Sequence, residues 1–340
     1  MGEVMAIIRN WTGGEHNFYG ASSWTPAGQP MPGDTVIIGP GSAKEPSVAT
    51  VNHHTVAGIT VLFDDGPGAI GSPYVPTLSL NGAMIGAGTL IENQAEESPA
   101  LGASDTEAVL IKGTVRNFGT IAENPGAQIG NTLNITLADR GTLVNGAGGT
   151  ISGTTISQLN IEGGSHSVVV NQGTISGQGT TLDIGVPVIG HGLIDMSRGG
   201  NPGSHFGTSS TVEFHQAVGN GQTIQLNDST LILDAPMTFL GTINDLSVSP
   251  NSAFATNSAV LLKGEHATDL SFNNDVLSVR NGSDLLASLH FLAGLGTGDF
   301  LLTNNAQGAF IGIVTPTASA GTMQAMQSAP LSFQPILDHS

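Results

Sequence analysis

Gly88-Thr89-Leu90-Ile91-Glu92-Asn93 is the first of four similar stretches, each an apolar run that ends on asparagine. The other three are Gly113-Thr114-Val115-Arg116-Asn117, Gly141-Thr142-Leu143-Val144-Asn145 and Ser167-Val168-Val169-Val170-Asn171. Their final asparagines follow one another at steps of 24, 28 and 26 residues. A period of this size is typical of repeat architectures. We therefore predict an all-β fold, in which successive coils of a parallel β-solenoid carry asparagine at a repeated turn.

A second series, Gly-Thr-apolar, follows each of the last three asparagines. Its copies are Gly119-Thr120-Ile121, Gly149-Thr150-Ile151 and Gly173-Thr174-Ile175. Two interleaved series predict more than one strand in each coil, with side chains that alternate between the core and the surface. Glycine and asparagine are expected at positive-φ corners between the strands. Stacked asparagines are expected to form a structural ladder of hydrogen bonds from coil to coil; the candidates are Asn93, Asn117, Asn145 and Asn171.

Changes in pattern along the chain predict four regions. They are an N-terminal cap (1–40), the β-solenoid (41–243) with loops leaving it near 94–108 and 195–210, a C-terminal antiparallel β cap or small sandwich (244–314), and a tail (315–340). The cap holds both tryptophans, which suit the covering of an exposed first coil. In the C-terminal region, Asn281-Gly282 separates two apolar runs, which is a strong hairpin signal. A second hairpin is predicted over residues 299–314.

Composition excludes several classes of function. The net charge is −18, and the eight Lys and Arg residues are scattered. The chain therefore has no basic patch for nucleic acid, and anionic membranes or polysaccharides would be repelled. The absence of cysteine excludes thiolate metal sites, thiol catalysis and disulfides. No apolar run is long enough to span a bilayer, and the first residues do not form a standard signal peptide.

Few residues are candidates for binding. Asp64 and Asp65 are adjacent in a turn and could supply oxygen ligands to Ca²⁺, although such pairs are more often solvated. Trp11, Trp24 and Tyr19 are candidates for stacking on sugars, the alternative being a purely structural cap. The histidines show no spacing typical of zinc sites, and most are expected to be surface or turn residues.

An enzyme that acts on polysaccharides is an alternative, because such enzymes need carboxylates that converge on one face. Asp183 and Asp195, with His191 between them, are the candidates. Gly190-His191-Gly192 faintly resembles a polygalacturonase motif, but the Asn-Thr-Asp and Arg-Ile-Lys motifs of that family are missing. We therefore assign no catalytic residue and do not expect an enzyme.

Two kinds of motif carry a family resemblance. The first comprises Val170-Asn171-Gln172-Gly173-Thr174-Ile175-Ser176-Gly177 and Val115-Arg116-Asn117-Phe118-Gly119-Thr120-Ile121, and the second is the opening from Trp24 to Ile38 with Pro32-Gly33-Asp34-Thr35-Val36-Ile37-Ile38. Together, over residues 24–245, they resemble bacterial haemagglutinin-like adhesins and autotransporter passengers, which are secreted β-solenoid repeat proteins. No outer-membrane barrel is recognisable here. The resemblance implies a right-handed parallel β-helix on the bacterial surface or outside the cell, used in adhesion, matrix or surface structure.

We expect an extracellular structural subunit that assembles with its own copies into a filament, matrix or surface layer. Residues 1–10 and 315–340 are the expected donors of pairing strands. Calcium or low pH could screen the acidic charge and permit assembly. A carbohydrate-binding adhesin that recognises surface glycans is the first alternative.

Overall fold

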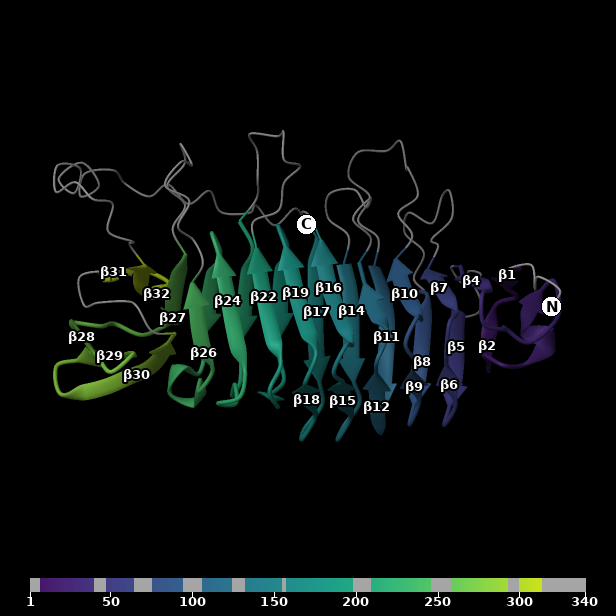
Figure 1. Ribbon diagram of the computed structural model, residues 1–340, viewed down its shortest axis with the longest axis horizontal. Helices are drawn as coiled ribbons and strands as arrows, with labels where there is room; N and C mark the ends of the chain where they lie inside the picture. The colour runs from purple at the N-terminus through teal and green to yellow at the C-terminus, as the bar shows by residue number, and fades with distance from the viewer. Residues whose placement is uncertain are drawn as a thin grey trace.

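The computed structural model describes residues 7–39, 47–63, 75–93, 106–123, 132–154, 157–197, 209–245, 258–292 and 300–313. Most of these residues are in β-strands, and the strands stack side by side along one long axis (Figure 1). Most pairs between successive coils are parallel, so the chain is a β-solenoid. The fold predicted from the two repeat series is therefore confirmed.

The described strands form three sheets. The fourteen-stranded sheet runs, in spatial order, β3 (Trp24–Thr25), β1 (Ile8–Trp11), β4 (Thr35–Ile38), β7 (Thr60–Phe63), β10 (Leu90–Asn93), β13 (Thr120–Ala122), β16 (Thr150–Thr154), β19 (Thr174–Gln178), β22 (Leu193–Ser197), β24 (Thr223–Asn227), β26 (Thr242–Asp245), β30 (Asp284–Phe291), β29 (Val276–Asn281) and β28 (Asp269–Asn273). The twelve-stranded sheet runs β2 (Gly14–Asn17), β5 (Ser47–Asn52), β8 (Thr77–Asn81), β11 (Thr106–Lys112), β14 (Thr132–Leu137), β17 (Gln158–Gly163), β20 (Thr181–Ile184), β23 (Thr211–Phe214), β25 (Thr230–Leu233), β27 (Ala259–Lys263), β32 (Gly308–Ile313) and β31 (Phe300–Asn305). The six-stranded sheet runs β6 (Thr55–Val56), β9 (Met84–Ile85), β12 (Thr114–Asn117), β15 (Thr142–Asn145), β18 (Val168–Asn171) and β21 (Val188–Ile189). Two short 3₁₀ turns are η1 (Ala21–Ser23) and η2 (Pro236–Thr238).

Each central coil contributes one strand to each sheet in turn. The coil β14–β15–β16 is followed by β17–β18–β19, and each strand pairs in parallel with its counterpart one coil later. Thr, Val, Ile and Leu favour this geometry because branched side chains pack well on a pleated surface. Inward positions of one sheet form continuous columns, such as Ile121, Ile151, Ile175 and Ile194, all 0% exposed. Burial of these columns is the main source of stability.

Three of the four predicted ladder residues stack as expected. Asn117, Asn145 and Asn171 end consecutive strands of the six-stranded sheet and are 0% exposed. Asn117 Nδ2 donates to Asn145 Oδ1 at 2.9 Å, and Asn145 Nδ2 donates to Asn171 Oδ1 at 2.9 Å. Gln222 continues the column, because its Oε1 accepts from Asn171 Nδ2 at 2.9 Å. The ladder therefore satisfies buried amides inside the core.

Asn93 does not belong to this ladder. It ends β10, a strand of the fourteen-stranded sheet, and the residue that pairs with Asn117 one coil earlier is Ile85. The step of 24 residues from Asn93 to Asn117 thus crosses from one sheet to another. The prediction of positive-φ corners is also wrong for the three stacked asparagines, which end extended strands and point inward.

The glycine of the Gly-Thr-apolar series is required by close packing. A Cβ at Gly119 would lie 2.6 Å from the carbonyl oxygen of Thr89, and one at Gly149 or Gly173 would collide with the backbone oxygen of the preceding coil. Glycine is the one residue that lets two backbones approach this closely.

The N-terminal end is closed by aromatic residues. Trp24 is 1% exposed and donates from Nε1 to the Phe18 carbonyl oxygen at 2.6 Å. Trp11 and Phe18 pack edge-on against it, with ring centroids at 4.8 and 5.3 Å. The strand β1 lies between β4 and β3 in its sheet: residues 8–10 pair with β4, and Asn10 and Trp11 pair with β3. A strand donated by residues 8–10 would have to leave that sheet first.

The C-terminal end changes to antiparallel pairing. The strands β29 and β30 form the predicted hairpin, in which Asn281 pairs with Asp284. The strands β31 and β32 form the second, in which Asn305 pairs with Gly308. Each hairpin extends a solenoid sheet, and Phe272, Phe291 and Phe300 pack between them with centroids 5.1–6.3 Å apart. The tail, residues 315–340, lies outside the described residues.

Candidate association face

The outer face of the six-stranded sheet carries one continuous row of mostly apolar side chains. Strand register places Met84, Arg116, Val144, Val170 and Ile189 opposite one another. They point outward because their strand neighbours Val115, Leu143 and Val169 are buried. Met84 is 38% and Ile189 is 44% exposed, and the two valines are partly exposed. In Figure 1 this sheet forms the lower edge of the stack.

The row continues beyond the last strand of the sheet. The bridges from Val188 to Val218 and from Val218 to Phe239 carry it on to Leu240, which is 52% exposed. Six strand spacings of about 4.8 Å separate Met84 from Leu240, so the row is roughly 29 Å long. Phe118 lies beside it, with its ring over Gly146, where a side chain would collide with that ring.

This face differs from the rest of the protein in charge. The six strands of the sheet contain no Asp or Glu, and Arg116 is their one charged residue. The chain as a whole has 26 acidic and 8 basic residues. A mostly apolar strip without acids on an acidic protein is typical of an interaction surface.

A second feature, which we call the His215 cluster, lies on the outer face of the twelve-stranded sheet. It comprises Asp183 of β20, Glu213 of β23, His215, Asp234 and Lys263 of β27. His215 Nε2 lies 2.7 Å from Asp183 Oδ1, and Nδ1 lies 2.6 Å from Asp234 Oδ2. Lys263 Nζ lies 3.2 Å from Asp234 Oδ1 and donates to Glu213.

The geometry fixes the charge of the histidine. A carboxylate only accepts hydrogen bonds, so each ring nitrogen of His215 must donate and the ring is an imidazolium. Burial alone would lower the pKa of His215, but the hydrogen bonds and charges of Asp234 and Asp183 raise it above its usual range. Burial would raise the pKa of Asp234, and the hydrogen bonds from His215 and Lys263 lower it.

The cluster is a poor metal site as it stands. Glu213, His215 and Asp234 offer ligand atoms within 4.8 Å of one another. However, Lys263 occupies both carboxylates and His215 has no lone pair to offer while both nitrogens are protonated. Its groups neutralise one another, which is typical of a structural ion network.

Two acids are buried among the described residues: Asp34, which accepts a hydrogen bond from Arg9, and Glu123. Glu123, next to the end of β13, is 0% exposed, and its Oε2 accepts from the backbone N–H of Thr154 at 3.0 Å. Its Oε1 has no hydrogen-bond partner among the described residues. Burial raises the pKa of Glu123 from its usual 4.5 to about 7, although hydrogen bonds from Ser157 and Thr154 oppose this.

The structure separates the acids proposed for catalysis. Asp183 lies in the twelve-stranded sheet and Asp195 in the fourteen-stranded sheet, so the two do not converge on one outer face. His191 follows β21 and is exposed. The candidates Asp183, His191 and Asp195 are therefore not brought together, and Asp183 is bound to His215 instead.

The other candidates have different outcomes. Trp24 is buried, so no face of its indole is open to a sugar and it is withdrawn as a glycan contact. Trp11 is half-buried against Trp24 and donates from Nε1 to the Gly14 carbonyl oxygen at 3.3 Å. Tyr19 lines a surface groove, described below. Asp64 and Asp65, the calcium candidates, lie outside the described residues.

The His215 cluster escaped sequence reasoning because its contacting pairs are 2 to 50 residues apart in the chain. A usable signal was present in the strands Thr181-Leu182-Asp183 and Thr211-Val212-Glu213, whose shared pattern places the two acids in register. The apolar row had a similar signal, since Val144 and Val170 both directly precede a ladder asparagine.

Within the part of the chain that is described, no helix has the length and apolar character needed to cross a bilayer. No protein-family model matches the chain, and no curated protein or solved structure matches it at a significant level.

Proposed function

We propose that this protein is a structural subunit outside a bacterial cell, and that its copies associate side by side through the six-stranded sheet. The observation that carries the proposal is the row from Met84 to Leu240, which is apolar except for Arg116 and free of acids on a chain of net charge −18. The absence of cysteine and the acidic composition suit an exported protein. The β-solenoid supplies a long, regular rod on which such a row can lie.

A second copy of the chain is the partner best suited to this face. Two molecules of this charge repel each other, and they approach at least cost where neither presents a carboxylate. Added salt screens the remaining repulsion, since the Debye length is about 8 Å at 0.15 M ionic strength. Association should therefore strengthen with salt, and Ca²⁺ bound between acidic faces should act in the same direction.

The size of the face indicates weak association of each pair. A row roughly 29 Å long and about 10 Å wide gives an area on the order of 300 Å² per partner. Stable dimers bury about 800 Å² per partner. Contacts of this size hold an assembly together when many subunits act at once, as in a matrix or surface layer.

Sedimentation velocity over a range of protein concentrations tests the proposal. The wild type should show concentration-dependent association at 0.5 M NaCl. Val170→Glu, in the row, should raise the protein concentration at which half of the molecules are associated by at least tenfold. Ser176→Glu adds the same charge on the outer face of β19 in another sheet and should leave that concentration unchanged. A wild type that stays monomeric at all concentrations, or equal effects of the two variants, would rule the proposal out.

A further inference from the structure

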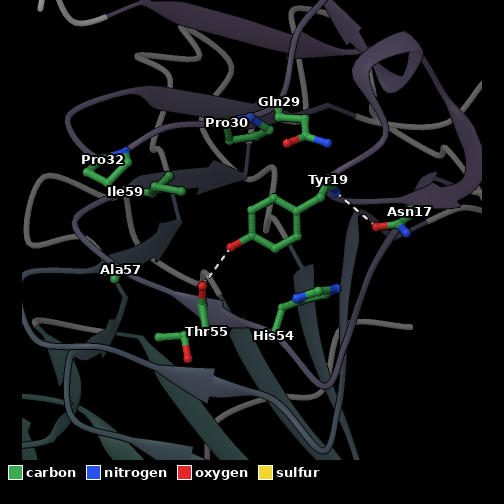
Figure 2. A pocket seen from close by; sticks show the side chains of 9 residues that line it. All are labelled: Asn17, Tyr19, Gln29, Pro30, Pro32, His54, Thr55, Ala57 and Ile59. Atoms are coloured by element: carbon green, nitrogen blue, oxygen red, sulfur yellow. Dashed lines mark hydrogen bonds between the residues drawn. The ribbon is translucent and has the colours of Figure 1, made fainter.

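The N-terminal coils enclose a groove of about 480 Å³ on the surface, and Tyr19 lies at its centre (Figure 2). The groove is built by the segment after β2, the loop before β4 and the segment around β6. Its lining is Asn17, Tyr19, Gln29, Pro30, Pro32, His54, Thr55, Ala57 and Ile59. The volume falls within the range of small-molecule sites, about 300–1,000 Å³.

Tyr19 is held in place before any ligand arrives. Its hydroxyl donates to the Thr55 carbonyl oxygen at 2.8 Å, and its backbone N–H donates to Asn17 Oδ1 at 2.9 Å. Phe18 and His54 pack edge-on against its ring, with centroids at 5.2 and 5.3 Å. A ring fixed in this way loses little conformational entropy when a ligand stacks on it.

The polar and apolar groups of the lining surround this ring on different sides. Figure 2 shows the side chains of Asn17, Gln29 and His54 around one side of Tyr19, and Pro32, Ala57 and Ile59 on the other. No Asp, Glu, Lys or Arg lines the groove. The chain has 26 acidic residues, but none of them lines this groove. A charged ligand of either sign would lose hydration there without gaining a partner of opposite charge, so the groove favours uncharged ligands.

From this arrangement we infer that the groove around Tyr19 is a binding site for a short, uncharged oligosaccharide. The apolar face of a sugar ring stacks on an aromatic ring, and the amides of Asn17 and Gln29 match its hydroxyl groups in hydrogen-bonding character. The net charge of −18 excludes acidic saccharides. The site adjoins the N-terminal end of the proposed association face, because Thr55 of the groove pairs with Met84, the first residue of the row.

Isothermal titration calorimetry of the full chain tests the inference. The probes are neutral tetrasaccharides built from β-linked glucose, α-linked glucose, β-linked xylose and β-linked N-acetylglucosamine. At least one should bind with a dissociation constant of millimolar or lower. Tyr19→Ala should weaken that binding tenfold or more, and Gln29→Ala should weaken it about threefold or more. Met31→Ala is the matched control, since Met31 is 54% exposed on the same loop but does not line the groove.

Thermal melting of each variant separates loss of the site from loss of the fold. If Tyr19→Ala lowers the melting temperature, Gln29→Ala decides the outcome, because Gln29 is a loop residue whose side chain faces the groove. The inference is overturned if no tetrasaccharide binds, if Met31→Ala weakens binding as much as Gln29→Ala, or if a proline-rich peptide binds in place of the sugars.

Discussion

The six-stranded and twelve-stranded sheets pass through the same coils, yet their outer faces differ in chemistry. On one, Val170 and Ile189 belong to an apolar row without acids. On the other, Asp183 and Glu213 lie in register and bind His215 and Lys263. Both sheets present the same kind of inward column to the core. Packing of the coils therefore restricts which side chains can point inward, whereas the side chains of each outward row can differ and serve a separate function.

The same contrast exists inside single strands of the six-stranded sheet. In β15, Val144 points outward and Asn145 points into the ladder. In β18, Val170 and Asn171 are arranged in the same way. We expect changes at the asparagines to alter folding and changes at the valines to alter association.

The largest effect on stability is expected at the ladder. Asn145→Val removes the bonds to Asn117 and Asn171 and leaves buried amide groups unpaired. Because each such group costs about 1–3 kcal/mol, the free energy of unfolding should fall by about 3–5 kcal/mol. Val144→Thr, one residue away on the outer face, should change it by less than about 0.5 kcal/mol. Urea unfolding measures both, and similar losses would show that the inward and outward rows do not differ.

The side chain of Glu123 points into the core, so its burial should make the stability of the protein depend on pH. Its raised pKa means that the folded state holds the proton more tightly than the unfolded state. The contribution of Glu123 to stability is therefore greatest below about pH 4.5 and is lost as the pH rises toward about 7. Glu123→Gln should raise the free energy of unfolding by roughly 2–3 kcal/mol at pH 8 and change it little at pH 4. Thermal melting at the two pH values checks this, and an equal change at both would contradict it.

The smallest effect on stability is expected at the His215 cluster, on the outer face of the twelve-stranded sheet. The raised pKa of His215 means that its contribution is fully present below its usual 6.5 and is lost as the pH rises through the raised value. The imidazole is 35% exposed and screened by solvent, so His215→Gln should cost only about 1 kcal/mol at pH 6 and less at pH 9. A loss that is the same at pH 6 and pH 9 would assign the effect to packing instead of charge.

Periodicity predicts the solenoid and the stacking of Asn117, Asn145 and Asn171, and turn residues between apolar runs predict the two C-terminal hairpins. It fails for Asn93, because segments between strands vary in length and the spacing alone does not show which sheet a strand joins. Trp24 has the structural role in the cap, and it stood as a sugar-contact candidate only because composition shows an aromatic residue at the end of the stack but not whether it is buried. The His215 cluster and the apolar row depend on strand register, which becomes readable only once strands of different coils are paired.

The most direct test of side-by-side association uses the absence of cysteine in the chain. Val170→Cys places a single thiol on the apolar row, and Ser176→Cys places one on the outer face of β19. Each variant is treated with a short bis-maleimide at a concentration where the wild type associates. The account predicts a high yield of cross-linked dimers from Val170→Cys and little from Ser176→Cys. Equal yields, or cross-linking from Ser176→Cys alone, would contradict it.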